Sequence, residues 1–423
     1  MEIVLIILPM PFLLAQKRNA PLGILYLAAA LEKAGYRVTL VDLRDIDKSG
    51  WLERIPQADI YGIGATSLEY NIAVELARKI KQHREGIIVL GGIHPTVVNT
   101  SSLDGIFDVI VQGEGELAML ELLSDYQKGG IKRCYKSLPI PNLDSLPLPA
   151  RHLLPYDSIV STRLVEQGQP GTTIITSRGC PYDCTFCCNN KIWGRKVRFH
   201  SADRVVDEIK FLMKEYSIYQ FRFQDDMMTI NKPRLKELSQ KLRPLDIKWR
   251  CHGRVDHADI ETLTLLKNAG CFEVAYGIET ASQEALDLCN KRTTVEQSIR
   301  AIQNTKRAGL KVRLFFIIGL PGDFGDVSGR NIAFIKMTEP DAVDISTLSP
   351  YPGCELYSNP AKFGMRLTSN DFDEYRMSLG WGNDEQERDF VFEYQSITTN
   401  QELKYHRREL LKFVKENSLD LNR

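Results

Sequence analysis

The sequence predicts an α/β protein in which two parallel-sheet domains are joined by a proline-rich linker. Over residues 1–136, short apolar segments alternate with segments whose apolar residues recur every three or four positions. Five prolines then fall within residues 137–156, and a second alternating series begins at Thr172. Alternation of strands with amphipathic helices is typical of parallel sheets covered by helices, and 423 residues are enough for two or three domains.

The first domain, residues 1–136, is predicted to be a Rossmann-like (flavodoxin-like) parallel sheet. Its expected strands span 2–8, 38–43, 60–65, 87–90 and 109–111. A helix is expected over 22–34, where Gly35 marks its end. Ligands of such sheets bind beyond the carboxyl ends of the strands. The residues predicted there are Thr66, Ser67, Gly91, Gly92, His94, Gly113 and Glu114.

The second domain, residues 166–380, is predicted to be a partial (β/α)6 barrel that follows a linker at 137–165. Its expected strands span 172–177, 221–224, 248–251, 274–277, 312–318 and 343–348. Six such units fit this length, because a full eight-stranded barrel takes about 250 residues. Residues 381–423 are expected to form a helical tail that includes the amphipathic stretch 400–415.

Composition narrows the class of protein. Lys and Arg total 54 and Asp and Glu total 54, which argues against a sequence-independent nucleic-acid binder. No apolar run reaches the length of a membrane span. The apolar start is interpreted as a buried strand and not a signal peptide, since it lacks a basic segment and contains Pro9 and Pro11. Three of the nine cysteines lie within eight residues, which favours metal or redox chemistry in a cytoplasmic protein.

The clustered cysteines are the strongest chemical signal in the sequence. Cys180, Cys184 and Cys187 follow the first strand of the second domain with C-x3-C-x2-C spacing. Three thiolates can hold three irons of a four-iron cluster and leave the fourth iron open to another ligand. A tetrahedral zinc site would need a fourth ligand, and Cys188 and His200 are close enough in sequence to keep that alternative open.

The sequence resembles the radical S-adenosylmethionine (SAM) superfamily, in the branch whose N-terminal domain is of the cobalamin (B12)-binding type. The cysteine motif carries most of this resemblance. The other matching segments are TSRGCPYDCTFC (176–187), FQDD (223–226), YGIET (276–280), IIGLPGD (317–323), PLGILYLAAALEKAGYRV (21–38), GGIHPT (91–96) and GEGE (113–116). The resemblance implies a [4Fe-4S] cluster on the three cysteines. It also implies that SAM, bound to the open iron, is cleaved to methionine and a 5′-deoxyadenosyl radical.

Further residues are expected to contact the cofactors. By resemblance, Phe186 stacks near the adenine of SAM and Glu279 contacts SAM. Asp225 and Asp226 end the second strand, where they either bind SAM or cap a helix. Two more candidates remain, Arg254, which either binds the SAM carboxylate or pairs with Asp256, and Gly319, which shapes a turn that can approach a ligand.

Cobalamin binding is expected in the first domain, although one motif of that family is absent. No D-x-H-x-x-G segment occurs, so no histidine from that motif coordinates cobalt. His94 either replaces it or shapes the loop between Gly92 and Pro95. The remaining glycines and polar residues at the strand ends are expected to contact the corrin or its nucleotide tail.

The resemblance implies cobalamin-dependent C-methylation of a small-molecule substrate, with a flavodoxin- or ferredoxin-type protein as electron donor. The alternative is a cobalamin-independent dehydratase, deoxygenase, epimerase or cyclase that acts on a sugar-like metabolite. A sensor that uses the cluster and a corrin would need an output or DNA-binding segment, and none is recognised in the sequence.

Overall fold

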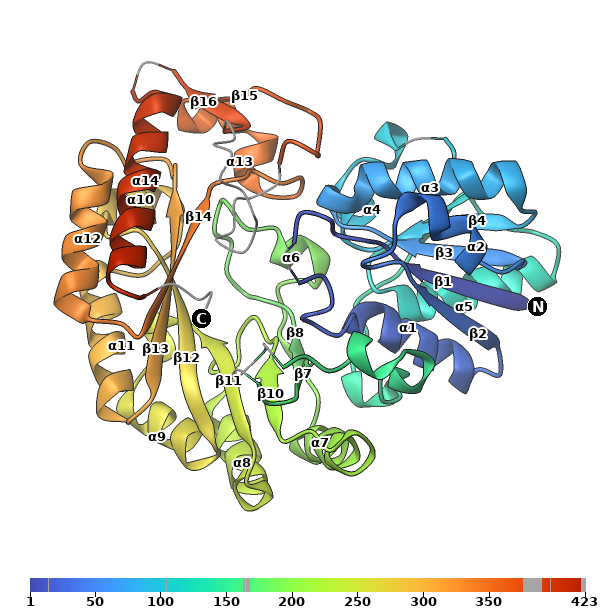
Figure 1. The fold of residues 1–423 in the computed structure, drawn as a ribbon, viewed down its shortest axis with the longest axis horizontal. Helices are drawn as coiled ribbons and strands as arrows, with labels where there is room; N and C mark the ends of the chain where they lie inside the picture. The colour runs from blue at the N-terminus through green and yellow to red at the C-terminus, as the bar shows by residue number, and fades with distance from the viewer. Residues whose placement is uncertain are drawn as a thin grey trace.

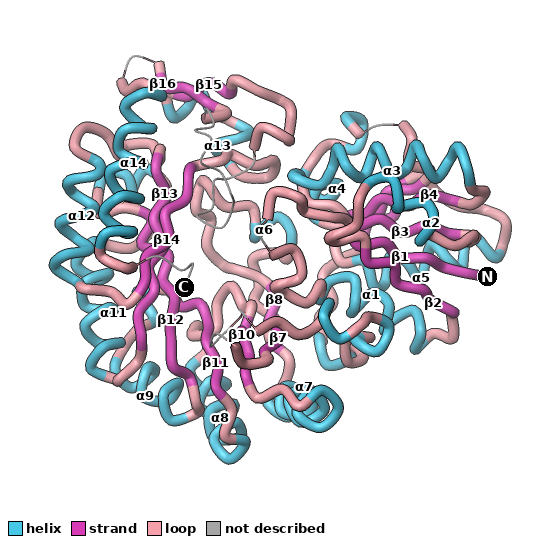
Figure 2. Tube along the Cα trace, viewed as in Figure 1, coloured by secondary structure: helices cyan, strands magenta, loops and turns pink. Residues whose placement is uncertain are grey.

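The computed structural model contains two α/β domains that lie side by side (Figure 1). It describes residues 1–13, 15–103, 105–162, 164, 168–375, 390–395 and 397–419. The predicted fold class is confirmed, because each domain is built on a six-stranded parallel sheet. Figure 2 shows these sheets as two separate groups of strands. The predicted domain boundaries at 165–166 and 380–381 lie outside the described residues.

The N-terminal sheet has the strand order β2-β1-β3-β4-β5-β6. The strands are β1 (Glu2–Ile7), β2 (Arg37–Asp42), β3 (Ile60–Gly64), β4 (Ile87–Gly91), β5 (Val109–Gln112) and β6 (Cys134–Lys136). The first five strands follow the flavodoxin-like order. Strand β6 was not predicted, since three residues are too few for a readable pattern.

Helices cover both faces of this sheet. One face packs against α2 (Trp51–Arg54) and α3 (Tyr70–His83), and the other against α1 (Leu22–Lys33) and α5 (Gly115–Gln127). The short helix α4 (Ile93–Val97) follows β4. Strand β1 reads as a continuous apolar run because side chains on both of its faces are buried.

The second sheet runs β14-β13-β12-β11-β10-β7 and curls into a half-barrel. Its strands are β7 (Gly171–Ile174), β10 (Gln220–Phe223), β11 (Lys248–Gly253), β12 (Cys271–Glu279), β13 (Lys311–Ile318) and β14 (Ala342–Thr347). The outer helices are α7 (Ala202–Tyr216), α8 (Lys232–Leu242), α9 (Ile260–Asn268), α10 (Gln283–Leu288), α11 (Val295–Arg307) and α12 (Val327–Thr338). The N-terminal domain lies on the side of the sheet away from this helical layer (Figure 1).

Shorter elements complete the second domain. They are the hairpin β8 (Ser177–Arg178) and β9 (Arg198–Phe199), the helices α6 (Asn189–Ile192) and α13 (Glu355–Ser358), and the pair β15 (Met365–Leu367) and β16 (Phe392–Tyr394). The final helix, α14 (Asn400–Glu416), packs beside α12 and β14. The helix expected over 400–415 is present as α14, and the tail also contains strand β16, whose buried Phe392 and Tyr394 pair with β15. None of the helices in the described ranges is both long and apolar enough to cross a membrane.

The linker packs against both domains. Ile140, Leu143 and Leu146 surround buried Tyr26 of the N-terminal domain. Arg151, which is 1% exposed, donates to the Thr173 carbonyl and to Glu208 of the half-barrel. The two domains are thus held through the segment that connects them.

A buried ion network joins the two domains directly. Glu114, at the carboxyl end of β5, pairs with Arg178 of β8 at 3.3 Å and with Arg198 of β9 at 2.5 Å. Arg178 also pairs with Glu116 at 2.7 Å. The Ile140 N–H of the linker donates to Glu114, and Arg198 donates to the Ile140 carbonyl. The four charged side chains are 5% exposed or less, so each charge depends on its partners.

This network predicts a large cost for removing one carboxylate charge. Glu114→Gln leaves two buried arginines with less negative charge, and we expect the free energy of unfolding to fall by about 3–5 kcal/mol. Urea unfolding followed by circular dichroism measures this. The matched variant Glu2→Gln, which breaks an exposed pair with Arg37, should change stability by less than about 1 kcal/mol. Equal losses in the two variants would contradict a structural role for this network.

Candidate active site

The three motif cysteines lie on one loop at the carboxyl end of the half-barrel sheet, directly after the hairpin strand β8. Gly179 opens the loop with φ +111°, and a Cβ at this position would lie 2.5 Å from the Lys196 carbonyl oxygen. Only glycine fits such a close approach of backbone to backbone. The Cys180 N–H donates to the Gly194 carbonyl at 3.3 Å, and the Cys187 N–H donates to the Cys184 carbonyl at 3.0 Å.

The cysteine loop is anchored to the barrel at its middle. The Thr185 N–H donates to the Cys289 carbonyl, and the Leu356 N–H donates to the Thr185 carbonyl. Asp183 pairs with Arg195 and Arg292 at 2.8 and 2.9 Å. These contacts fix the loop on both sides of Cys184, at Asp183 and at Thr185.

The chemistry of the thiols fits a soft metal cluster. Cys180, Cys184 and Cys187 are free thiols and are partly exposed. Burial raises the pKa of Cys187 to about 12 and also raises the pKa of Cys180. Thiolates at these positions therefore need a positively charged partner, which iron supplies. Across the described ranges, no three His, Cys, Asp or Glu side chains lie close enough together to hold a single metal ion.

Asp225 and Asp226 have different environments although they are adjacent. Asp225 is fully buried and accepts hydrogen bonds from the Thr176 N–H, the Thr176 hydroxyl and the Ser177 hydroxyl. It therefore braces the segment that leads into the cysteine loop. Asp226 accepts from Asn189 of α6 at 2.7 Å, and burial together with Asp225 raises its pKa to about 7. Neither carboxylate caps α8, whose N-terminus is capped by Asn231.

Arg254 lies beside the cysteine loop. Its guanidinium stacks 3.6 Å from the ring centre of Tyr182 and pairs with Asp256 at 2.9 Å. It also donates to the Lys291 carbonyl. The ion pair with Asp256, one of the two alternatives predicted for Arg254, is therefore present. The stacked guanidinium is also a candidate partner for the carboxylate of a bound ligand.

Glu279 pairs with a lysine that sequence reasoning missed. Lys291 Nζ lies 2.5 Å from Glu279 Oε1, and both side chains are nearly buried. Although burial opposes its protonation, Glu279 and Cys184 hold the Lys291 pKa above its usual value. The same ammonium lies 5.7 Å from the Phe186 ring centre. Lys291 follows α10 among polar residues, a pattern typical of an exposed turn, so the sequence carried no signal for it.

Two backbone positions near this pair are unusual. Glu279 has φ +67°, at a register shift between β12 and β13. Strained non-glycine residues of this kind cluster at functional sites. Gly319 has φ +97°, and a Cβ there would lie 3.0 Å from Phe392. Its carbonyl accepts from the Tyr394 hydroxyl, so Gly319 joins the end of β13 to β16.

Of the residues predicted to contact cobalamin in the N-terminal domain, some line a cavity and the others lie elsewhere in the domain. Thr66 and Gly92 line a cavity of about 1520 Å³, whereas Ser67, Gly91, His94, Gly113 and Glu114 do not. His94 is 2% exposed, bonds Ser67 at 3.0 Å and stacks on Tyr70 at 4.2 Å. Gly113 lies against the Ser137 carbonyl, and Glu114 belongs to the ion network between the domains.

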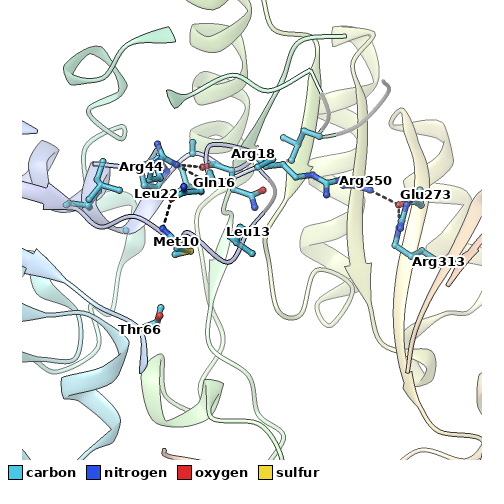
Figure 3. A pocket seen from close by; sticks show the side chains of 18 of the residues that line it. Met10, Leu13, Gln16, Arg18, Leu22, Arg44, Thr66, Arg250, Glu273 and Arg313 are labelled. Atoms are coloured by element: carbon cyan, nitrogen blue, oxygen red, sulfur yellow. Dashed lines mark hydrogen bonds and ion pairs between the residues drawn. The ribbon is translucent and has the colours of Figure 1, made fainter. Parts of the chain in front are cut away.

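The cavity lies between the two domains (Figure 3). On one side it is lined by the loop after β1 and by the carboxyl ends of β3 and β4. On the other side it reaches the amino ends of β11–β14 and the interior of the half-barrel. Its volume exceeds that of an ordinary small-ligand pocket. The loop after β1 contributes Met10, Leu13, Gln16 and Arg18. The strand end at residues 9–11 was expected to lie at the ligand edge of the sheet, whereas Leu13, Gln16 and Arg18 were not singled out.

Two family models match the chain. Residues 174–326 match the radical SAM superfamily, and residues 15–123 match the B12 binding domain. The fold, the cysteine loop and these matches define a radical SAM protein with an N-terminal B12-binding-type domain.

Individual relatives cover most of the chain. It is 32% identical over 374 residues to an uncharacterized methyltransferase of Pyrococcus horikoshii, which covers 83% of this chain and 80% of that protein. It is 29% identical over 386 residues to the anaerobic magnesium-protoporphyrin IX monomethyl ester cyclase of Rubrivivax gelatinosus, with 84% and 68% covered. The structure of the radical SAM methyltransferase TsrM from Kitasatospora setae, with cobalamin and a [4Fe-4S] cluster bound, superposes with TM-score 0.74 at 15% identity. That match covers 99% of this chain and 90% of TsrM.

The chain therefore belongs to the family of radical SAM enzymes that carry a B12-binding domain.

The buried position of His94 predicts a pH-dependent stability. Burial lowers its pKa to about 4, whereas the unfolded chain titrates near the usual 6.5. The stabilising effect of neutral His94 is fully present above pH 6.5 and is lost as the pH falls toward 4. Between pH 7 and 4.5 the His94→Phe variant should lose about 2–3 kcal/mol less stability than the wild type.

Urea unfolding at several pH values measures this difference. The control variant His83→Gln, at the exposed end of α3, should follow the wild-type profile. Parallel profiles for His94→Phe and the wild type would contradict the assignment of a buried neutral imidazole.

Proposed function

We propose that the protein is a cobalamin-dependent radical SAM enzyme that methylates a carbon atom of a small metabolite. One observation carries the proposal: the anchored cysteine loop closes the carboxyl end of the half-barrel, while the 1520 Å³ cavity joins the barrel interior to the strand ends of the B12-type domain. We therefore assign SAM and the corrin to separate sites, SAM at the cysteine loop and the corrin in the cavity, whose described lining includes no residue of that loop. The names of the Pyrococcus relative and of TsrM support methyl transfer.

In this proposal, the residues of the cysteine loop hold and orient the cluster and SAM. Cys180, Cys184 and Cys187 are the ligands of a [4Fe-4S] cluster, which supplies the electron that makes a radical from SAM. Arg254 is placed to pair with the SAM carboxylate. Phe186 belongs to the loop, and Glu279 is linked to it through Lys291, whose ammonium lies 5.7 Å from the Phe186 ring centre. Phe186 and Glu279 are the proposed partners of the adenine and of the polar groups of SAM.

Asp226 and Gly319 are further proposed contacts at the carboxyl ends of the strands. The Asp226 carboxylate lies near the cysteine loop through Asn189 of α6. Asp225 acts as a positioning residue, because all of its described hydrogen bonds go to Thr176 and Ser177. It keeps the start of the loop in register with β10.

The N-terminal domain is proposed to hold cobalamin without a histidine ligand. Thr66 and Gly92 face the cavity, while Ser67, Gly91, His94, Gly113 and Glu114 are proposed to support the surrounding loops. No histidine occurs among the described residues that line the cavity. His94 is enclosed by Tyr70 and Phe372, which supports a loop-shaping role.

The alternative function keeps the radical chemistry and omits methyl transfer. The cyclase of Rubrivivax gelatinosus, with similar coverage, supports a cyclase or another radical conversion. In both cases a flavodoxin- or ferredoxin-type protein is the proposed electron donor. Nine free cysteines fit a reducing compartment, and we place the protein in the cytoplasm.

The ligand assignment predicts which cysteine is needed for iron. Cys184→Ala should lose most of the iron after anaerobic reconstitution, because three thiolates are the minimum for a site-differentiated cluster. Cys188→Ala is the matched control and should retain about four irons per chain. Iron, sulfide and cobalt analysis measures both. Full iron in Cys184→Ala, or zinc in place of iron, would contradict the proposed cluster.

The products derived from SAM distinguish the two functions. Methyl transfer through cobalamin uses two molecules of SAM and yields S-adenosylhomocysteine together with 5′-deoxyadenosine. Radical cyclisation or dehydration yields 5′-deoxyadenosine without S-adenosylhomocysteine. We expect both products from the reconstituted, cobalamin-loaded enzyme during turnover, quantified by liquid chromatography and mass spectrometry. Deoxyadenosine alone would favour the alternative function.

A further inference from the structure

The interior of the half-barrel contains a cluster of three arginines, two buried and one partly buried, that the proposed cofactors do not use. Arg222, Arg250 and Arg313, here called the lumen arginines, lie on β10, β11 and β13. Glu273 on β12 accepts from Arg250 at 3.1 Å and from Arg313 at 2.8 and 3.1 Å. Arg313 also lies 3.4 Å from Asp344 on β14. One carboxylate is therefore shared by two of the three arginines.

The third arginine has a neutral neighbour. Arg222 donates to His252 Nε2 at 3.4 Å. Burial and the nearby arginines lower the pKa of His252 to about 3, so this imidazole carries no charge. Burial, followed by Arg250, Arg18 and Arg313, lowers the pKa of Arg222 to about 9. Positive charge thus exceeds negative charge among the described side chains around Arg222.

This cluster is open to the cavity between the domains. Arg250, Glu273 and Arg313 line the 1520 Å³ cavity, and Figure 3 shows Arg18 of the N-terminal loop reaching toward Arg250. A second cavity of about 20 Å³, lined by Arg222 and His252 as well, lies behind them. That volume accommodates one water molecule or one oxygen atom. Arg250 is 8% exposed, and its Nε has no hydrogen-bond partner in the described part of the chain.

A purely structural network would be expected to balance its charges. Burying a charge is costly unless opposite charges and hydrogen bonds compensate it. Here Arg250 and Arg313 line the large cavity and Arg222 lines the small cavity beside it, so an incoming anion would supply the missing negative charge. Guanidinium groups match carboxylates and phosphates with two parallel hydrogen bonds.

We propose that the lumen arginines bind an anionic group, a carboxylate or a phosphate, of the enzyme's substrate. This inference rests on the proposed function, because it identifies the substrate class of the same site. Arg250 precedes Arg254 by four residues along β11 and its end, which corresponds to about 13 Å of extended chain. The substrate would hold its anionic end at the lumen arginines and present its reacting carbon toward the cysteine loop.

Calorimetric titration of inorganic phosphate and of succinate into the reconstituted, cobalamin-loaded enzyme tests the proposal. We expect one of these anions to bind the wild type at one site per chain. Arg222→Gln should weaken that binding roughly tenfold or more, and Arg222→Lys should restore part of it. The matched control Arg37→Gln, at an exposed arginine, should bind as the wild type does. Absence of binding by both anions, or equal binding by Arg222→Gln and the wild type, would overturn the proposal.

Thermal unfolding separates a binding role from a structural one. In Tris-chloride buffer without other anions, Arg222→Gln should melt at the wild-type temperature or higher, because it removes an uncompensated buried charge. The anion should then raise the melting temperature of the wild type more than that of the variant. A lower melting temperature for Arg222→Gln with undiminished anion stabilisation would overturn the proposal.

Two further experiments identify the source of the anion and distinguish a failure of this inference from a failure of the proposed function. Cobalamin carries a phosphodiester, whereas cobinamide lacks it. Anion binding in the cobinamide-loaded enzyme but not in the cobalamin-loaded enzyme would assign the arginines to the cofactor and overturn the proposal. Binding in both supports a substrate site. Formation of 5′-deoxyadenosine by the wild type tests the radical chemistry independently. If anion binding depends on Arg222 but no 5′-deoxyadenosine forms, the proposed function is contradicted and the anion site is not.

Discussion

A buried ion network of Glu114, Glu116, Arg178 and Arg198 holds the two domains in their relative position. It joins the carboxyl end of β5 to the hairpin β8–β9, and the cysteine loop lies within that hairpin. Because these charges are excluded from water, neither domain can shift without leaving a carboxylate or a guanidinium unpaired. The same contacts therefore set the position of the cysteine loop relative to the B12-type domain and define the cavity between them.

The half-barrel carries its thiols and its arginine cluster in two different places. The carboxyl ends of its strands carry the thiols, Arg254 and the Glu279–Lys291 pair, while its interior carries the lumen arginines. The strands are parallel, so residues a few positions apart on one strand are presented at different depths of the same lumen. Under the proposed function, this arrangement offers a substrate one region for binding and another for reaction. Asp225, at the end of β10, has a supporting role: its carboxylate accepts hydrogen bonds from Thr176 and Ser177 and so holds the segment that leads into the cysteine loop.

Much of the fold was readable from local patterns. Strands β1–β5 and β12–β14 contain apolar or alternating runs, whereas β7, β10 and β11 are more polar and were predicted from the strand–helix alternation. The C-x3-C-x2-C motif placed the cysteines after β7. Three features were not predicted from the sequence: β6, the pair β15–β16 and the hairpin β8–β9. Their strands are too short to show a periodic pattern. Lys291 and the lumen arginines also escaped, because a charged residue in a sequence looks exposed until its burial is known.

The class of protein follows from local features of the sequence, the cysteine spacing and the alternation of strands with helices. The roles of the polar residues follow from contacts that form only in the folded chain. Glu114 became part of a domain junction and His94 a buried neutral imidazole, although both lie beside strand ends where ligands bind. The physical reason is that the role of a charged group depends on its burial and on partners distant in sequence, such as Arg178 for Glu114. Such partners are brought together only when both sheets have formed and packed.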